Sequence, residues 1–130
     1  MDNCLFCKIV SNEIPSYTIY EDDLVKVFLD INPSTNGDML IVPKKHYENV
    51  YDLDEALVPH IHKLIKKLYD LVKEKLGAEG LTIAQNNGHG QEIKHYHVHV
   101  TPRYSNDGIL VNKNTDILKD LDEILNKLTK

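Results

Sequence analysis

The sequence predicts an α+β fold with a mainly antiparallel sheet, and three observations carry this prediction. Short runs of β-branched and aromatic residues, separated by turn residues, predict strands. Among them lies a long stretch with apolar residues at spacings of three and four, which predicts an amphipathic helix. A further apolar pattern near the end of the chain predicts a C-terminal helix. Strands grouped around one long helix and joined by short turns are typical of the α+β class.

Five strands are expected along the chain. In order, they are residues 17–20, 24–29, 39–42, 81–85 and 95–101. An acidic turn separates the first two strands, and a turn that contains Pro33 and Gly37 precedes the third. Pro43 ends the third strand, because proline has no N–H to donate to a sheet.

The long helix is expected between Asp54 and Gly77. Asp54 is a candidate N-cap, and Gly77 is a candidate for the left-handed residue that follows a helix. Pro59 fits only in the first turn, where its missing N–H has no intrahelical partner to lose. The C-terminal helix is expected to start at Thr115, with Asp116 near its positive end. The apolar residues that it is expected to bury are Ile117, Leu121, Ile124, Leu125 and Leu128.

A chain of 130 residues is expected to fold as one domain. Its net charge of −5 excludes a general attraction to nucleic acid polymers or anionic membranes. No apolar stretch approaches the roughly 20 residues that cross a bilayer, and the polar amino terminus does not resemble a secretory signal. We therefore expect a cytoplasmic protein with neither a membrane nor a nucleic acid polymer as partner.

Three of the seven histidines alternate in the last predicted strand. Successive side chains of a strand point to opposite faces, so His95, His97 and His99 share one face and the residues between them pack on the other. Three imidazoles in a row fill a core poorly, which favours a functional site. The pattern leaves two interpretations open: a metal site that uses two or three of the rings, or a catalytic histidine held by its neighbours.

The two cysteines form a Cys-x-x-Cys motif, Cys4 and Cys7, near the amino terminus. A disulfide between them would close a tiny loop, so metal binding or redox chemistry is the better interpretation. Two thiolates at this spacing are the usual half of a tetrahedral zinc site, which two imidazoles would complete. His46 and one strand histidine are the candidates. A thioredoxin-like motif needs a strand before it, and nothing apolar precedes Cys4.

Five blocks of residues, in the same order, resemble the histidine triad (HIT) family of nucleotidyl hydrolases and transferases. The densest is the His-x-His-x-His strand, and the resemblance runs from Cys4 to about Tyr104. The other blocks are Phe28-Leu29-Asp30-Ile31-Asn32-Pro33, Leu40-Ile41-Val42-Pro43-Lys44-Lys45-His46, Asn86-Asn87-Gly88 and Gly90-Gln91. The resemblance implies a single HIT-like domain over residues 1–130, with a core at about 4–104 and a C-terminal loop and helix at about 105–130.

The resemblance implies that His97 is a nucleophile, which attacks an α-phosphorus and forms a nucleotidyl-histidine that water then hydrolyses. His99 would contact the phosphate or help the leaving group depart. The substrate residues that it implies are Phe28, Asp30, Ile31, Asn86, Gly90 and Gln91, of which Gln91 would donate to the phosphate oxygens. The expected substrate is an AMP or GMP derivative: a phosphoramidate, a mixed anhydride or a dinucleoside polyphosphate. The enzyme would then be a nucleoside phosphoramidase or nucleotidyl hydrolase.

The Cys-x-x-Cys motif is similar to that of the zinc-binding branch of the family, whose members are protein kinase C inhibitor-like or adenosine phosphoramidase-like. The zinc ligands implied by this resemblance are Cys4, Cys7, His46 and His95. Four protein ligands fill a tetrahedron, so the zinc would be structural. The resemblance also implies a homodimer that pairs through the long helix and a sheet edge.

Two residues depart from the family pattern. Asp38 stands where members commonly have a histidine, and either it replaces that histidine as a hydrogen-bond acceptor or the reaction is slower. Glu92 stands where many phosphoramidase-like members have serine, and its carboxylate would repel a phosphate unless it points away or is protonated. Two alternatives therefore stay open: a nucleotide-binding or scaffold protein with weak turnover, and a metal-dependent hydrolase that uses the three strand histidines.

Overall fold

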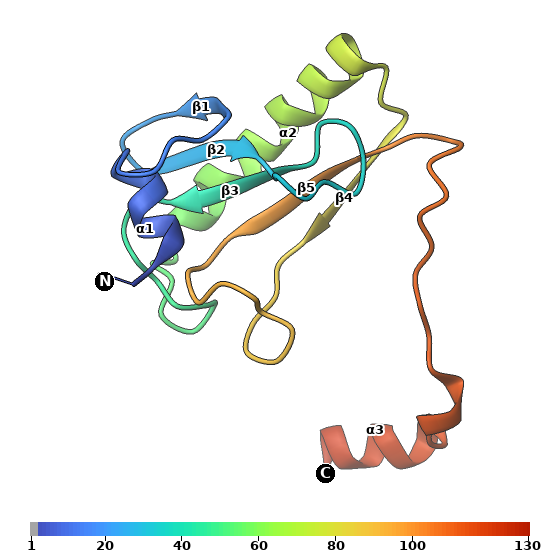
Figure 1. Cartoon of the computed structure of the whole chain (residues 1–130). Helices are drawn as coiled ribbons and strands as arrows, with labels where there is room; N and C mark the ends of the chain where they lie inside the picture. Colours follow the sequence, from blue (N-terminus) through green and yellow to red (C-terminus); the bar gives the residue numbers. More distant parts are fainter. Residues whose placement is uncertain (1–2) are drawn as a thin grey trace.

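The computed structural model describes residues 3–130, which form a five-stranded sheet with helices packed on its two faces (Figure 1). The elements are α1 (Leu5–Val10), β1 (Thr18–Glu21), β2 (Val25–Leu29), β3 (Met39–Pro43), α2 (Leu57–Leu76), β4 (Gly80–Ala84), β5 (Val98–Arg103), the 3₁₀ turn η1 (Thr115–Ile117) and α3 (Leu121–Thr129). The strands lie in the order β1-β2-β3-β5-β4, and every neighbouring pair is antiparallel. The predicted α+β class and antiparallel sheet are confirmed.

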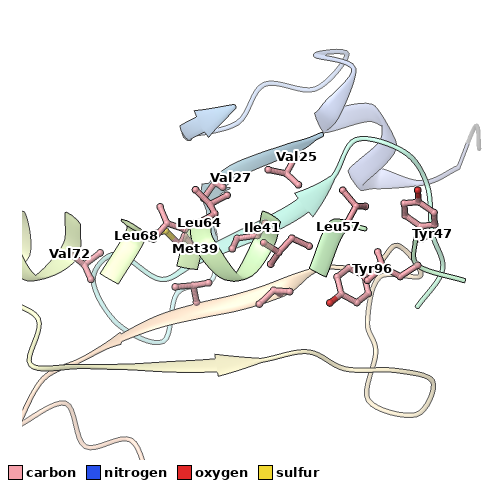
Figure 2. Packing of buried hydrophobic residues seen from close by; sticks show 14 of the residues in the cluster. Val25, Val27, Met39, Ile41, Tyr47, Leu57, Leu64, Leu68, Val72 and Tyr96 are labelled. Carbon is pink, nitrogen blue, oxygen red and sulfur yellow. The ribbon is translucent and has the colours of Figure 1, made fainter. Parts of the chain in front are cut away.

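The main hydrophobic core lies between α2 and one face of the sheet (Figure 2). Leu64 and Leu68 of α2 pack there with Val27 and Ile41, which pair across β2 and β3. All five residues of β3 are buried. A continuous apolar strand of this kind requires cover on both faces of the sheet.

The second face is covered by α1, which was not predicted. Phe6 and Ile9 of α1 pack there in a smaller apolar cluster that includes residues of β2 and β3. Lys26 of β2 is only 2% exposed, and its Nζ donates to the Ile9 carbonyl at 3.1 Å and to Asn12 Oδ1 at 2.8 Å. The lysine therefore ties the end of α1 to the sheet. A helix of six residues is too short to show a periodic pattern in the sequence.

β5 begins three residues later than predicted and ends two residues later. The prediction placed residues 95–101 in this strand. Residues 95–97 instead lie beside the loop that follows β3, where the Tyr96 N–H donates to the Tyr47 carbonyl at 2.6 Å. The predicted alternation of faces still holds, because Tyr96 packs in the core under α2 while His95 and His97 contact α1 on the other side.

α2 begins at Leu57 and not directly after Asp54, the predicted N-cap. Asp54 instead opens the preceding turn, since its Oδ1 accepts from the Ala56 N–H and its carbonyl accepts from the Leu57 N–H, both at 3.0 Å. Pro59 lies in the first turn and Gly77 follows the helix at φ 70°, as predicted. No helix within residues 3–130 has the length and the apolar run needed to cross a membrane.

The prediction for the C-terminal helix is wrong in its start and in its burial. Thr115 begins only the turn η1, and the chain is extended at Leu118 before α3 starts at Leu121. The segment before η1 leads away from the sheet, and α3 lies apart from it (Figure 1). The apolar side chains of α3 therefore do not reach the core of this single chain. The residues predicted as buried but found exposed are Ile117, Leu121, Ile124, Leu125 and Leu128.

The carboxylate of Asp22 ties the β1–β2 turn to α2. It accepts hydrogen bonds of 2.7–2.9 Å from the N–H groups of Leu24 and Val25, the Tyr20 hydroxyl and the His60 ring. Burial raises the pKa of Asp22, but these donors outweigh burial and lower the pKa to about 2. The charged form therefore stabilises the fold.

We expect Asp22→Asn to lower the free energy of unfolding at pH 7 by about 2 kcal/mol. A carboxyl whose pKa is lower in the folded than in the unfolded chain stabilises the fold above the unfolded pKa, and this contribution is lost as the pH falls through the folded pKa. The difference between wild type and variant should therefore shrink from about pH 4 to pH 2. Urea unfolding at a series of pH values measures it. The matched control is Asp23→Asn in the same turn, and a difference that stays constant down to pH 2 would contradict the assignment.

Candidate active site and metal centre

Four sulfur and nitrogen side chains from distant parts of the chain converge beside α1. Cys4 is the N-cap of α1 and Cys7 lies within it, while His46 follows β3 and His95 precedes β5. Their ligand atoms all lie within 4.8 Å of one another. Cys4 Sγ lies 3.4 Å from His95 Nδ1, Cys7 Sγ lies 3.3 Å from His46 Nδ1, and the two Nδ1 atoms are 3.2 Å apart. The structure thus brings together the four residues that the sequence predicted as ligands.

The donor set fits a tetrahedral zinc ion. Bonds of about 2.0–2.1 Å to nitrogen and 2.3 Å to sulfur place adjacent ligand atoms about 3.3–3.8 Å apart, which is close to the separations observed. His95 Nε2 lies 2.8 Å from the Pro43 carbonyl and donates to it, so the lone pair is on Nδ1, toward the cysteines. Burial lowers the pKa of His95 to about 4, which keeps the ring neutral, the form that binds a metal.

The cysteines also favour a cation at this position. Burial, together with the neighbouring Cys4, raises the pKa of Cys7 to about 11. Two adjacent thiolates repel each other and are therefore unfavourable without a bound cation. A divalent ion between them would stabilise both. The Cys7 N–H donates to Cys4 Sγ at 3.3 Å, which orients that sulfur toward the cluster.

A cavity of about 490 Å³ lies on the same face of the sheet and adjoins this cluster. Its walls come from Phe6 of α1, from the loop that joins β2 to β3, from the loop that joins β4 to β5, and from β5 itself. His97 and His99 both line it. His99 pairs with Leu40 and Ala84 in the register of the sheet, so it stands at the middle of the sheet and not at an edge.

His97 is held as a neutral imidazole with one defined tautomer. Its Nδ1 lies 2.7 Å from the His95 carbonyl, and we assign the ring proton to this nitrogen because a carbonyl can only accept. The lone pair is then on Nε2. Burial lowers the pKa of His97, and the edge-to-face contact with Phe6, at 5.0 Å between ring centroids, contributes to that burial. The ring of His99 lies 4.9 Å from that of His97.

Asp38 does not orient His97. Its carboxylate is buried, and it accepts from the Thr101 hydroxyl at 2.7 Å and from the Ser34 N–H at 2.9 Å. The backbone carbonyl of His95 supplies the acceptor for His97 instead. Asp38 therefore fastens the β2–β3 loop to β5 and shapes one wall of the cavity.

The predicted substrate residues fall into two groups. Asp30, Asn86 and Gly90 line the cavity together with the two histidines. The residues expected at the site but absent from the lining are Phe28, Ile31 and Gln91. Phe28 is buried below Phe6, and Ile31 is 79% exposed.

Gln91 is placed differently from the expectation that its side chain donates to a phosphate. Its Nε2 donates to the Glu48 carbonyl at 2.6 Å, and its Oε1 accepts from the Gly88 N–H at 3.1 Å. The side chain is buried by these contacts. Gln91 therefore shapes the loop that carries Gly90.

The sequence analysis missed several lining residues, among them Thr101 and Phe6. Thr101 lies two residues beyond His99, so the same alternation of faces could have placed it at the site. Phe6 lies between the two cysteines and covers both His95 and His97. No sequence pattern indicated Phe6, because its position depends on how α1 docks.

The fold and the site together define a class of protein: a small α+β domain with a neutral, buried histidine facing an open cavity and a Cys₂His₂ cluster behind it. The sequence model of one family, described as the HIT domain, matches residues 11–106. The chain belongs to the HIT family, as the sequence predicted.

Relatives of known sequence or structure match most of the chain. An uncharacterized HIT-like protein of Methanocaldococcus jannaschii is 44% identical over 127 residues, which are 96% of this chain and 98% of that protein. The adenosine 5′-monophosphoramidase of Schizosaccharomyces pombe is 36% identical over 103 residues, 78% of this chain and 74% of that enzyme. The crystal structure of a zinc-bound histidine triad family protein from Mycobacterium smegmatis superposes with a TM-score of 0.80 at 34% identity, covering 88% of this chain and 85% of that one.

Proposed function

We propose that the protein hydrolyses a purine nucleoside 5′-phosphate derivative, with an AMP or GMP phosphoramidate as the first candidate, through a nucleotidyl-histidine on His97. The observation that carries the proposal is the state of His97: a neutral ring with its Nδ1–H on a backbone carbonyl and its other nitrogen available beside a cavity. The similarity to an adenosine 5′-monophosphoramidase supports this choice of substrate.

In the proposed reaction His97 Nε2 attacks the α-phosphorus as the bond from phosphorus to the leaving nitrogen breaks. The attached ring becomes positively charged, and the His95 carbonyl that accepts from Nδ1 stabilises that charge. His99 gives the leaving amine its proton and then takes one from the attacking water. Water releases the nucleoside monophosphate and restores neutral His97.

The other lining residues are proposed to bind the substrate. Asp30 would accept from the ribose hydroxyls, while Asn86 and the N–H at Gly90 would donate to the phosphate without adding charge. Ile31 offers exposed apolar surface for the base, and Phe28 supports this side of the site from below through Phe6.

We also propose that Cys4, Cys7, His46 and His95 hold a structural zinc, as supported by the cluster geometry and by the zinc-bound relative. When bound, zinc would supply the positive charge that keeps both cysteines as thiolates. No step of the reaction uses the ion. The alternative of a metal-dependent hydrolase is not favoured, because the ring nitrogens of His95 are directed to the cysteine cluster and to Pro43, away from His97.

A homodimer is the proposed assembly. β4 forms one edge of the sheet, and Ile83 on it is 51% exposed beside an apolar hollow that α2 also lines. An exposed edge with apolar neighbours is a surface that pairs readily with another strand. The molar mass in solution, measured by light scattering, tests this arrangement. The expected cytoplasmic location and the division into a core and a C-terminal segment stay predictions.

One experiment tests the proposed chemistry. The protein is mixed with adenosine 5′-phosphoramidate, quenched in denaturant within the first turnover and analysed by intact mass. We expect a chain that carries one adenylyl group, on a peptide that contains His97. Turnover without any adduct would contradict the covalent mechanism. Binding of AMP without turnover would instead favour the nucleotide-binding alternative.

A further inference from the structure

The lining of the cavity has an unusual charge for a site that is proposed to hold a phosphate. Among the described residues 3–130, the lining contains three carboxylates, those of Asp30, Asp38 and Glu92, and no lysine or arginine. A phosphate with an anionic leaving group would bring further negative charge among them. The negative charge of the cavity therefore disfavours substrates with an anionic leaving group.

Two of the three carboxylates already have partners. Asp30 accepts from the Asn32 N–H at 2.9 Å, and Asp38 accepts from Thr101 and Ser34. Both lie on the loop between β2 and β3, the side proposed to bind the nucleoside. They are therefore engaged in shaping that side of the cavity.

Glu92 differs in place and in environment. It is exposed and lies on the opposite loop, between β4 and β5, together with Gly90 and Asn86. The Lys94 ammonium donates to the Gly88 carbonyl at 3.2 Å, and the ion pairs found among residues 3–130 do not include one between Lys94 and Glu92. Asp30 and Glu92 are both close enough to His97 for their negative charges to raise the pKa of that ring, against the larger effect of burial. The Glu92 carboxylate thus lines the cavity near His97, on the loop opposite the one that is proposed to bind the nucleoside.

We propose that Glu92 selects substrates whose leaving group carries a positive charge, namely nucleoside phosphoramidates of an amine that bears a second, remote ammonium. The inference rests on the proposed function and specifies its substrate class. The bond from phosphorus to nitrogen breaks, the leaving nitrogen gains one proton, and the remote ammonium stays charged against the Glu92 carboxylate. Leaving groups that are polyphosphates are disfavoured by the same charge.

Three adenosine substrates test the proposal. The 3-aminopropyl phosphoramidate and the butyl phosphoramidate have leaving groups of matched size, with and without a remote ammonium, and diadenosine tetraphosphate has an anionic leaving group. We expect kcat/KM for the aminopropyl substrate to exceed that for the butyl substrate by about fivefold at low salt. In Glu92→Gln this ratio should fall to about one, and hydrolysis of the tetraphosphate should rise. Glu55→Gln removes the same charge from an exposed position outside the cavity, and it should leave the ratio unchanged.

Salt provides a second measurement that needs no variant. Because ions screen a partly exposed pair, the wild-type ratio should decrease toward one as the ionic strength rises. Equal rates for the two phosphoramidates in the wild type, or a ratio that survives Glu92→Gln, would overturn the inference and leave the proposed function standing. A protein that hydrolyses none of the three substrates would overturn both.

Discussion

Replacement of His97 by alanine is expected to lower kcat/KM for adenosine 5′-phosphoramidate by on the order of 10³-fold or more, about 4 kcal/mol of transition-state stabilisation. The variant loses the nitrogen that would form the covalent bond, and it also loses the ring whose Nδ1–H is held on the His95 carbonyl. Steady-state release of AMP measures the effect. The adduct seen by mass should disappear as well.

Two further histidine variants test whether the loss of activity is specific to His97. His99→Ala should slow the reaction less, by about 10²-fold, because it removes proton transfer and leaves the nucleophile in place. His62→Ala removes an exposed imidazole of α2 that lies outside the cavity, and it should turn over at the wild-type rate. Retention of near wild-type turnover in His97→Ala would rule out the nucleotidyl-histidine route.

Loss of the metal cluster is the second large effect that we expect. The wild type should contain about one zinc per chain, and Cys4→Ser or His46→Ala should bind much less. Both variants should be destabilised by about 4 kcal/mol or more, because the ligands connect α1 to segments far along the chain. Metal analysis and thermal unfolding measure the two quantities. Catalysis should also fall, since Phe6 on α1 covers His97.

The matched control for His46→Ala is His89→Ala, which removes an exposed histidine that is not part of the cluster. Its zinc content and unfolding temperature should equal those of the wild type. A full equivalent of zinc in both Cys4→Ser and His46→Ala would contradict the ligand assignment.

Much of the sheet could be predicted because its pattern is local. The runs that became β2 and β3 differ from the predicted strands by a single residue, and the alternation around His97 placed it on the correct face. The start of β5 could not be predicted, because it depends on where β3 stops pairing. The burial of α3 was wrong for a related reason: an apolar stripe shows that a helix can be covered, but not what covers it.

The candidate site, like the fold, could be predicted only in part. The spacing of Cys4 and Cys7 indicated half of a metal cluster, and His46 was already a candidate. The resemblance to a family was needed to choose His95 among the strand histidines. Lys26 stands within an apolar strand and shows no sign of burial in the sequence, because its partners belong to α1. Gln91 was expected to face a phosphate, and its contacts with the Glu48 and Gly88 backbones depend on loop geometry that no sequence pattern reveals.

The central position of β5 determines which parts of the site can move. β5 is hydrogen-bonded to β3 on one side and to β4 on the other, and His99 lies where all three strands meet. Amide protons in such a strand exchange with solvent only when the whole domain opens, whereas exposed loop residues such as 86–90 exchange through small local openings. His99 therefore belongs to the least mobile part of the cavity lining. The loops that face His99 are the part of the site that can open without unfolding the sheet.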